Sequence, residues 1–293
     1  MDLCTINFPN LGIKLHNIGE GISIFGFEIK YYGIVITLGF ILAYFLTRAE
    51  AKRTKQDPEI YLDYLLCMIL PAIIGARLYY VIFSWDLYKD NPIQVFNIRG
   101  GGLAIYGGII AGVITLIVFC MVRKQKFLVM ADTIVMGLLV GQIMGRWGNF
   151  FNREAFGGFT DGLFAMQIPV SDASYTTTEL LEKAVQIGGE TYIQVHPTFL
   201  YEGLWNLGIL LFLLWFRKRK RITGEMFYIY GVLYGLGRFF IEGLRTDQLL
   251  IFGKIPVSQI VAVACMVVFT TLLIQGRIKN KPEYIPPLST TEE

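Results

Sequence analysis

The chain alternates between long apolar stretches and shorter polar connections. Seven apolar stretches have the length of a membrane-crossing helix, about 20 residues. They cover residues 31–47, 60–83, 103–122, 128–147, 198–216, 225–243 and 256–275. Uninterrupted apolar runs of this length are typical of membrane spans. We therefore expect an all-α polytopic membrane protein with about seven transmembrane helices, forming one integral membrane domain over residues 1–293.

Two polar segments stand out between and after these stretches. Residues 150–195 have a soluble composition, and we expect them to form a small extracytoplasmic head between spans four and five, with a short helix beginning near Thr177. A connection of this length is more often functional than idle. Residues 279–293 contain Pro286 and Pro287 and several polar residues, so we expect a solvated, disordered cytoplasmic tail.

The distribution of basic residues gives the expected orientation. Of the 26 Lys and Arg residues, 15 lie in one set of loops and eight on the opposite side. Basic loops stay in the cytoplasm, so we expect the N-terminus outside and the C-terminus inside. The first thirty residues lack the pattern of a cleaved signal peptide. The remaining three basic residues, Arg77, Arg146 and Arg238, fall inside apolar stretches, and for Arg77 we favour a structural role.

Composition narrows the classes of function. Hydrophobic residues make up 54% of the chain and charged residues only 17%, against about 25% charged in a typical soluble domain. The net charge of +3 gives no argument for nucleic-acid binding. The four cysteines are widely scattered and there are only two histidines, so we expect no metal site and no disulfide framework.

The stretch Gly145–Glu154 carries the densest chemistry, because Arg146, Asn149 and Glu154 directly follow an apolar run. An arginine at the membrane boundary costs about 3 kcal/mol or more unless it is paired. In the sixth stretch, Arg238, Glu242 and Arg245 are spaced i, i+4 and i+7, which places them on one face of a helix.

Two interpretations of these arginines are open. One is an internal salt bridge that lets a helix carry polar groups. The other is anion recognition, since guanidinium forks suit bidentate binding of a phosphate or carboxylate. The candidate residues that map to the outer half of the membrane are Tyr32, Tyr106, Arg146, Asn149, Glu154, Arg238 and Glu242. This convergence favours a site for a phospholipid head group that opens to the outer leaflet.

Five ordered motifs carry a family resemblance that spans residues 20 to 275. They are Ile-Lys-Tyr-Tyr-Gly, Gly-Gly-Gly-Leu-Ala-Ile-Tyr-Gly-Gly, Gly-Arg-Trp-Gly-Asn-Phe-Phe-Asn-Arg-Glu followed by Gly157, His-Pro-Thr-Phe-Leu-Tyr-Glu, and Gly-Arg-Phe-Phe-Ile-Glu-Gly-Leu-Arg. In this order they resemble the prolipoprotein diacylglyceryl transferases, enzymes of the bacterial cytoplasmic membrane.

The resemblance implies a reaction and roles for residues. A diacylglyceryl group would pass from phosphatidylglycerol to the thiol of a lipobox cysteine in a prolipoprotein signal peptide. This forms a thioether and releases glycerol 1-phosphate, as the first step of lipoprotein maturation, without a cofactor. The implied catalytic residues are Arg146, Arg238 and Tyr106; those implied to bind phosphatidylglycerol are Arg146, Asn149, Glu154, Gly157, Tyr32, Glu242 and Arg245; those implied to support the site are His196, Tyr201, Glu202, Gly107 and Gly108.

The acceptor of the thiol proton is open, because Tyr106 stands where many family members have a histidine. Three options are a tyrosinate activated by an arginine, a carboxylate such as Glu202 or Glu242, and no dedicated base, with an arginine lowering the pKa of the substrate thiol. We favour the last. Rival functions are a lipid or anion transporter and a non-catalytic phospholipid-binding protein. The route of substrate entry, the preferred prolipoproteins and the oligomeric state do not follow from the sequence.

Overall fold

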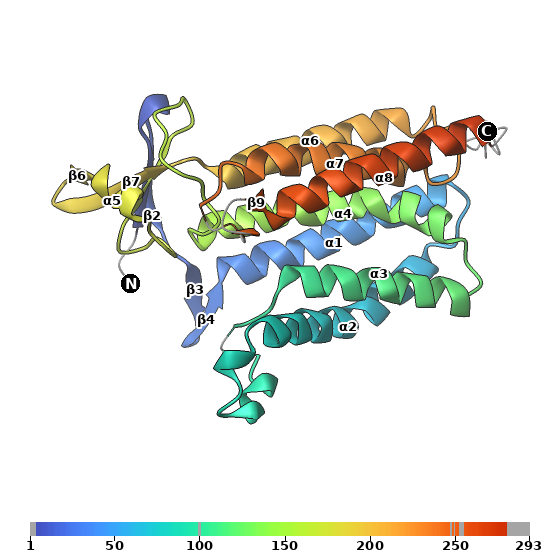
Figure 1. The fold of residues 1–293 in the computed structure, drawn as a ribbon, viewed down its shortest axis with the longest axis horizontal. Helices are drawn as coiled ribbons and strands as arrows, with labels where there is room; N and C mark the ends of the chain where they lie inside the picture. The colour runs from blue at the N-terminus through green and yellow to red at the C-terminus, as the bar shows by residue number, and fades with distance from the viewer. Residues whose placement is uncertain (1–3, 99–100, 247, 249, 252–254, 280–293) are drawn as a thin grey trace. The chain divides into compact units, whose positions relative to one another are not determined.

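The computed structural model describes residues 4–98, 101–246, 248, 250–251 and 255–279 (Figure 1). The long helices are α1 (Tyr31–Arg53), α2 (Glu59–Phe83), α3 (Ile105–Val122), α4 (Phe127–Phe151), α6 (Thr198–Phe216), α7 (Glu225–Glu242) and α8 (Val257–Lys279). Each coincides with one predicted apolar stretch. In the described part of the chain, all of them except α7 are long and apolar enough to cross a membrane, which makes six. The polytopic membrane class is therefore confirmed, whereas the seventh span and the orientation stay predictions.

The chain divides into two compact units, which are described separately. The first contains residues 1–45 and 135–284, and the second contains residues 46–134 together with 285–293. Helices α1 and α4 each contribute to both units. Of the predicted tail, Lys279 is the last residue of α8, and residues 280–293 lie outside the described part.

A small antiparallel sheet belongs to the first unit. Its strand order is β2-β1-β5-β7-β6. The strands are β1 (Cys4–Phe8), β2 (Ile13–Ile18), β5 (Met166–Pro169), β6 (Val185–Ile187) and β7 (Glu190–Val195). The turn between β6 and β7 is Gly188-Gly189, with φ of 61° and 87°, the positive values that a two-residue hairpin needs. The apolar-span pattern did not predict this sheet, nor that residues before the first span supply two of its strands.

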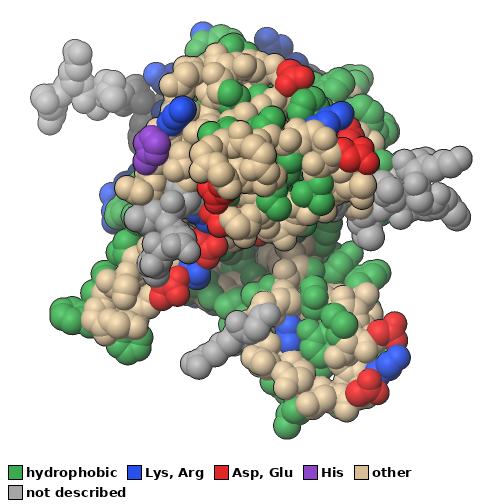
Figure 2. Space-filling model, turned by 90° about the vertical axis from the view of Figure 1, so that its left-hand side faces the viewer, with side chains coloured by type: hydrophobic (Ala, Val, Ile, Leu, Met, Phe, Trp, Pro, Cys, Tyr) green, Lys and Arg blue, Asp and Glu red, His purple; other side chains and the backbone are tan. Residues whose placement is uncertain are grey.

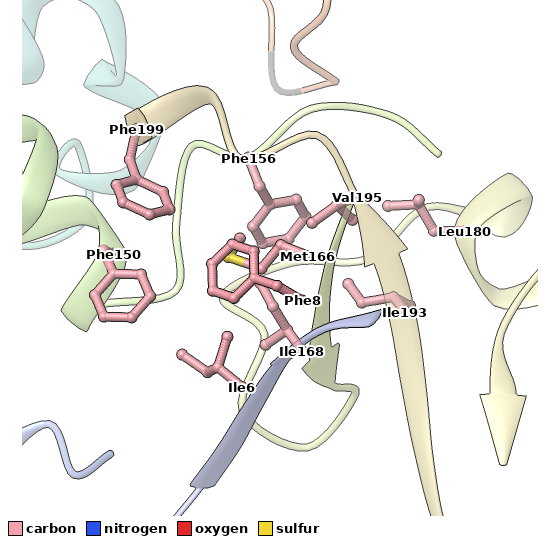
Figure 3. Close-up of a cluster of buried hydrophobic side chains, with 10 residues drawn as sticks. All are labelled: Ile6, Phe8, Phe150, Phe156, Met166, Ile168, Leu180, Ile193, Val195 and Phe199. Carbon is pink, nitrogen blue, oxygen red and sulfur yellow. The ribbon is translucent and has the colours of Figure 1, made fainter. Parts of the chain in front are cut away.

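The sheet is held by a cluster of buried apolar side chains (Figure 3). Ile6 and Phe8 come from β1, Ile168 from β5, Ile193 from β7, and Phe150 from the end of α4. Because α4 and the strands share one core, the end of this helix is fixed to the head. The short helix α5 (Thr178–Glu182) packs nearby, and the Thr177 hydroxyl accepts from the Leu180 N–H, as an N-cap does. This confirms the predicted short helix.

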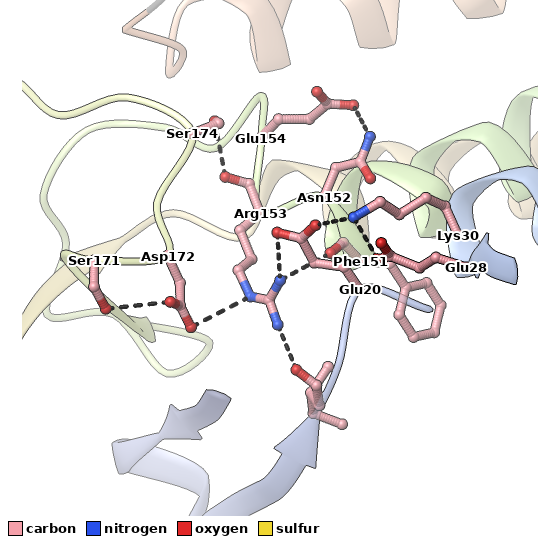
Figure 4. Close-up of polar contacts among 11 residues, drawn as sticks. Glu20, Glu28, Lys30, Phe151, Asn152, Arg153, Glu154, Ser171, Asp172 and Ser174 are labelled. Carbon is pink, nitrogen blue, oxygen red and sulfur yellow. Dashed lines mark hydrogen bonds and ion pairs between the residues drawn. The ribbon is translucent and has the colours of Figure 1, made fainter. Parts of the chain in front are cut away.

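Several short elements complete the list. They are the hairpin β3 (Gly21–Ile24) and β4 (Phe27–Lys30), the pair β8 (Leu250–Ile251) and β9 (Ile255–Pro256), and the 3-10 turns Pro9–Leu11, Trp85–Leu87 and Pro92–Phe96. On the face drawn in Figure 2, acidic side chains lie beside lysine and arginine side chains in several places. Lys30 pairs with Glu20 and Glu28, at 2.7 and 2.8 Å (Figure 4). These exposed pairs raise the pKa of Lys30.

In the second unit, α2 and α3 pack closely along glycines. A Cβ on Gly107 would lie 2.2 Å from the Gly75 carbonyl oxygen, and one on Gly75 would lie 2.5 Å from the Ala111 Cβ. Small residues at such positions let helix backbones approach. Gly107 therefore lies at a close contact between the two helices, and the Gly112 carbonyl also accepts from the Tyr64 hydroxyl at 3.2 Å.

Arg77 has the structural role that we favoured. Its buried guanidinium donates to five backbone carbonyls of the loop after α2, those of Gln94, Val95, Asn97, Gly101 and Gly102, at 2.7 to 3.0 Å. It also lies over the ring of Tyr88, 5.1 Å from the centroid. Arg77 therefore forms the polar centre of this loop.

Candidate active site

Glu202 is the centre of a buried ionic cluster in the first unit. One of its carboxylate oxygens lies 2.7 Å from an Arg146 nitrogen, and both accept from Arg238 at 3.2 Å. Arg238 also pairs with Glu242, four residues on, at 2.6 Å. The two arginine side chains are each 17% exposed and Glu202 only 3%. Two guanidiniums and two carboxylates balance, so the cluster carries no net charge.

The cluster joins three helices, because Arg146 lies on α4, Glu202 on α6, and Arg238 and Glu242 on α7. The sequence predicted Arg146 and Arg238 as partners across the bundle, and the structure joins them through Glu202. The structure therefore shows the internal salt bridges of the first interpretation, and anion recognition stays a prediction. The pairs are internal salt bridges, and the guanidiniums also keep partial exposure and further N–H donors.

Asn149 and Glu154 extend the cluster towards the head. With its amide carbonyl turned towards Arg146, Asn149 accepts from the guanidinium at 3.2 Å and donates to the Glu154 carboxylate at 3.1 Å. Asn152 donates to the same carboxylate oxygen at 3.2 Å. Tyr32 belongs here too: its ring packs against Gly148, where a Cβ would lie 2.8 Å away. Its hydroxyl interacts electrostatically with Glu154 and Arg146. Three residues of the stretch that the sequence singled out, Arg146, Asn149 and Glu154, are thus connected by hydrogen bonds.

Arg153, the second arginine of that stretch, has a structural role instead (Figure 4). It is buried and has a φ of 49°. Its guanidinium donates to the Ile18 carbonyl and to the Phe151 carbonyl, and it lies 3.5 Å from Glu20. Its own carbonyl accepts from the Ser174 hydroxyl at 2.9 Å. Arg153 therefore ties the segment before the first span to the head.

Gly157 lies where three backbone segments meet. Its N–H donates to the His196 carbonyl at 3.0 Å, and it forms a bridge with Arg245. A Cβ on Gly157 would lie 2.6 Å from the Leu244 carbonyl oxygen and 2.8 Å from the His196 Cβ. This position requires glycine for packing, while its contact with lipid stays a prediction. The bridge also fixes the backbone at Arg245, just beyond α7.

His196 and Tyr201 lie at the start of α6. The His196 Nδ1 is 3.4 Å from the Tyr201 hydroxyl. Burial lowers the pKa of His196 below its usual 6.5, because the charged imidazolium is poorly solvated there. The histidine is thus neutral near pH 7. These residues precede Glu202 by six and one positions and orient the beginning of its helix.

Tyr106, Gly107 and Gly108 belong to the second unit. The Tyr106 ring lies 6.3 Å from that of Tyr79 at an angle of 36°. Both glycines face α2, where Gly107 contacts Gly75 and Gly108 contacts Ala72. Their part in the same site as the arginines stays a prediction.

Three residues of this region were not picked out from the sequence. The Tyr234 hydroxyl interacts electrostatically with Arg146, and Gln142 donates to the Tyr230 hydroxyl at 2.7 Å. Tyr234 and Tyr230 precede Arg238 by four and eight residues, and Gln142 precedes Arg146 by four. This spacing, which places them on the same helix faces as the arginines, was the sequence signal that could have identified them. Within the described residues, no group of three or more His, Cys, Asp or Glu side chains could hold a metal ion.

The fold and site define a class: a polytopic membrane protein with an arginine–glutamate cluster buried between three helices, in a unit that also contains a small antiparallel sheet. The family model for prolipoprotein diacylglyceryl transferase matches residues 20–275. The chain belongs to this family, whose members are transferases.

Curated relatives agree over nearly their whole length. A phosphatidylglycerol–prolipoprotein diacylglyceryl transferase of Finegoldia magna is 45% identical over 254 residues, covering 86% of this chain and 93% of the relative. Proteins of the same name from Clostridium novyi and Listeria innocua are each 40% identical. The first alignment covers 89% of this chain and 97% of the relative, and the second covers 90% and 91%.

Proposed function

We propose that this chain transfers the diacylglyceryl group of phosphatidylglycerol to the thiol of a lipobox cysteine in a prolipoprotein signal peptide. In this reaction the bond between a glycerol carbon and a phosphate oxygen breaks, a carbon–sulfur bond forms, and glycerol 1-phosphate leaves. The thiol proton passes to an acceptor. The observation that carries the proposal is the buried Arg146–Glu202–Arg238 cluster, in a chain of this family.

The charge changes of the reaction fit guanidiniums. A lipid phosphodiester carries one negative charge, and the departing phosphate monoester carries close to two at neutral pH. Negative charge therefore grows on the phosphate in the transition state, where positioned cationic donors stabilise it most. Arg146 and Arg238 are held by Glu202, Glu242 and Asn149, so little reorganisation is needed when the phosphate arrives.

The carboxylates also shape how lipid binds. Because Glu202 already pairs with both arginines, the lipid phosphate has to share or take over some of their N–H groups. A guanidinium has five donors, so Arg146 can keep Glu202 and Asn149 and still donate to a phosphate oxygen. For the thiol, we propose no dedicated base: the arginine pair lowers the pKa of the substrate thiol. Glu202, Glu242 and Tyr106 are the competing acceptors.

We further propose that the chain has seven spans, with the N-terminus outside and the site facing the outer leaflet of the bacterial cytoplasmic membrane. The support is the loop charge bias and the position of the cluster at the head-side ends of α4, α6 and α7. Placing the site there gives it access to lipid in the outer leaflet and to a signal peptide that has crossed the membrane.

The test is a transfer assay with labelled phosphatidylglycerol and a lipobox peptide, in which the thioether product is measured. Arg146→Ala and Arg238→Ala should each lower the rate by about 100-fold or more, as loss of a transition-state donor does. Arg146→Lys, which keeps the charge but not the fork, should retain more activity. Arg219→Ala is the matched control, because Arg219 lies past the other end of α6, stacked on Trp215.

Membrane insertion of each variant is measured in parallel. Wild-type rates in an inserted Arg146→Ala variant would refute the assignment. Lipid binding by the wild type without any thioether product would favour the non-catalytic alternative, and movement of lipid without product would favour the transporter.

A further inference from the structure

A second layer of polar side chains lies one helical turn below the ionic cluster. Gln142 is four residues before Arg146 on α4, and Asn206 is four residues after Glu202 on α6. Helix α4 runs into the head, whereas α6 leaves it, so both steps lead away from the head. Four residues correspond to about 6 Å along a helix, and side chains at this spacing share a face.

Helix α7 confirms that the layers are in register. Tyr234 interacts electrostatically with Arg146 in the outer layer, and Tyr230 accepts from Gln142 at 2.7 Å in the inner layer. The two tyrosine rings stack with centroids 5.4 Å apart. Residues four apart on α4 thus contact residues four apart on α7 in both layers. The inner layer is therefore a regular part of the packing between these helices.

The inner layer leaves polar atoms unsatisfied. Asn206 is 0% exposed, and among the described residues neither its amide nitrogen nor its amide oxygen has a hydrogen-bond partner. The Gln142 amide oxygen is likewise buried and unpaired there. Each such group costs about 1 to 3 kcal/mol, and a membrane interior supplies no bulk water to satisfy it. Two amides in this state indicate that something polar binds between these helices.

Both amides can act as donors. Asn206 has a free NH₂ group. The Gln142 amide can turn by half a rotation, so that its oxygen accepts from the Tyr230 hydroxyl and its NH₂ group becomes free, because amide oxygen and nitrogen have nearly the same shape. The inner layer then offers two N–H donors below two guanidiniums.

We propose that Gln142 and Asn206 bind the two ester carbonyls of the phospholipid substrate, an inference that rests on the proposed function. In a diacyl phospholipid, one ester group sits on the glycerol carbon next to the one that bears the phosphate, and the other sits one carbon further away. They lie on the apolar side of the phosphate and can only accept hydrogen bonds. With the phosphate at Arg146 and Arg238, the esters fall one turn deeper, at the two amides.

This arrangement has a consequence for the reaction. The glycerol carbon that receives the thiol lies between the phosphate and the esters, so holding both sides fixes its position for in-line attack. Such orientation contributes to rate by making attack effectively intramolecular. The two amides are positioning residues in this scheme, while the guanidiniums stabilise the leaving group.

The test compares diacyl phosphatidylglycerol with its dialkyl ether analogue, which lacks both carbonyls. The full-length protein is used, with kcat/KM for transfer and equilibrium lipid binding as readouts. Each hydrogen bond contributes a factor of about 2 to 12, so the wild type should prefer the ester lipid by roughly tenfold. Asn206→Leu and Gln142→Met should each reduce this preference, and the double variant should abolish it. Gln259→Met is the control, because Gln259 on α8 already donates to the Phe239 carbonyl at 2.9 Å.

Equal use of ester and ether lipids by the wild type would overturn the inference, and this comparison needs no variant to fold. So would a double variant that lowers transfer from both lipids by the same factor, because that result marks a purely structural role. Failure of the proposed function is a separate outcome. In that case no thioether forms with either lipid, and the binding preference for ester over ether lipid still decides the inference.

Discussion

Replacing Glu202 with glutamine should destabilise the protein more than any exposed charge change. Glu202 pairs with both Arg146, at 2.7 Å, and Arg238, at 3.2 Å. The variant leaves two guanidiniums facing the single carboxylate of Glu242, which gives the buried cluster a net charge of +1. Removing one partner of a buried pair costs about 3 to 5 kcal/mol. Glutamine keeps one accepting oxygen, so we expect the lower end of that range, about 3 kcal/mol.

Thermal unfolding in detergent measures this cost. In domains of 150 to 250 residues, 1 kcal/mol shifts Tm by about 2 to 4 °C, so Tm should fall by roughly 6 to 12 °C. The control is Glu179→Gln, since Glu179 pairs with Lys183 at a similar 2.9 Å but is 67% exposed. An exposed pair contributes at most about 1 kcal/mol, so Tm should change by only a few degrees.

An anionic lipid gives a second, independent readout. Because the Glu202→Gln cluster is cationic, phosphatidylglycerol should restore its Tm more than the zwitterionic phosphatidylcholine does. The reasoning is refuted if Glu202→Gln lowers Tm no more than Glu179→Gln does, since the two arginines would then not depend on Glu202.

Two further predictions concern the junction of the head and the helices. Gly157→Ala places a Cβ 2.6 Å from the Leu244 carbonyl oxygen and should cost about 1 to 3 kcal/mol by overpacking, measured as a lower Tm. Gly203→Ala, where a Cβ would meet nothing within 4 Å, should not destabilise, and equal effects would contradict the close approach at Gly157. For His196, the folded-state pKa lies below the unfolded value of 6.5. The unfolded chain then binds the proton first, so stability falls as the pH drops below 6.5. His196→Gln should lose less Tm than the wild type between pH 7.5 and 5.5, and parallel curves would exclude this contribution.

The sequence by itself determined the helices. Apolar runs of spanning length predicted all seven long helices, with ends that differ by up to six residues, because a helix satisfies its backbone groups within one segment. The spacing of Arg238 and Glu242 predicted their pair, since i and i+4 always meet on a helix.

Only the tertiary structure decided which residues pair across the bundle. The sequence indicates only a supporting role for Glu202, because nothing local marks it as the acceptor for Arg146, 56 residues before it, or for Arg238, 36 residues after it. The packing of α4, α6 and α7 brings the three side chains together. Gln142 and Asn206 are unremarkable in an apolar run until their burial and missing partners are known. The head sheet was missed for the same reason, since β1 pairs with β5 across more than 150 residues. Local patterns fix local geometry, whereas contacts between distant segments depend on how the whole chain packs.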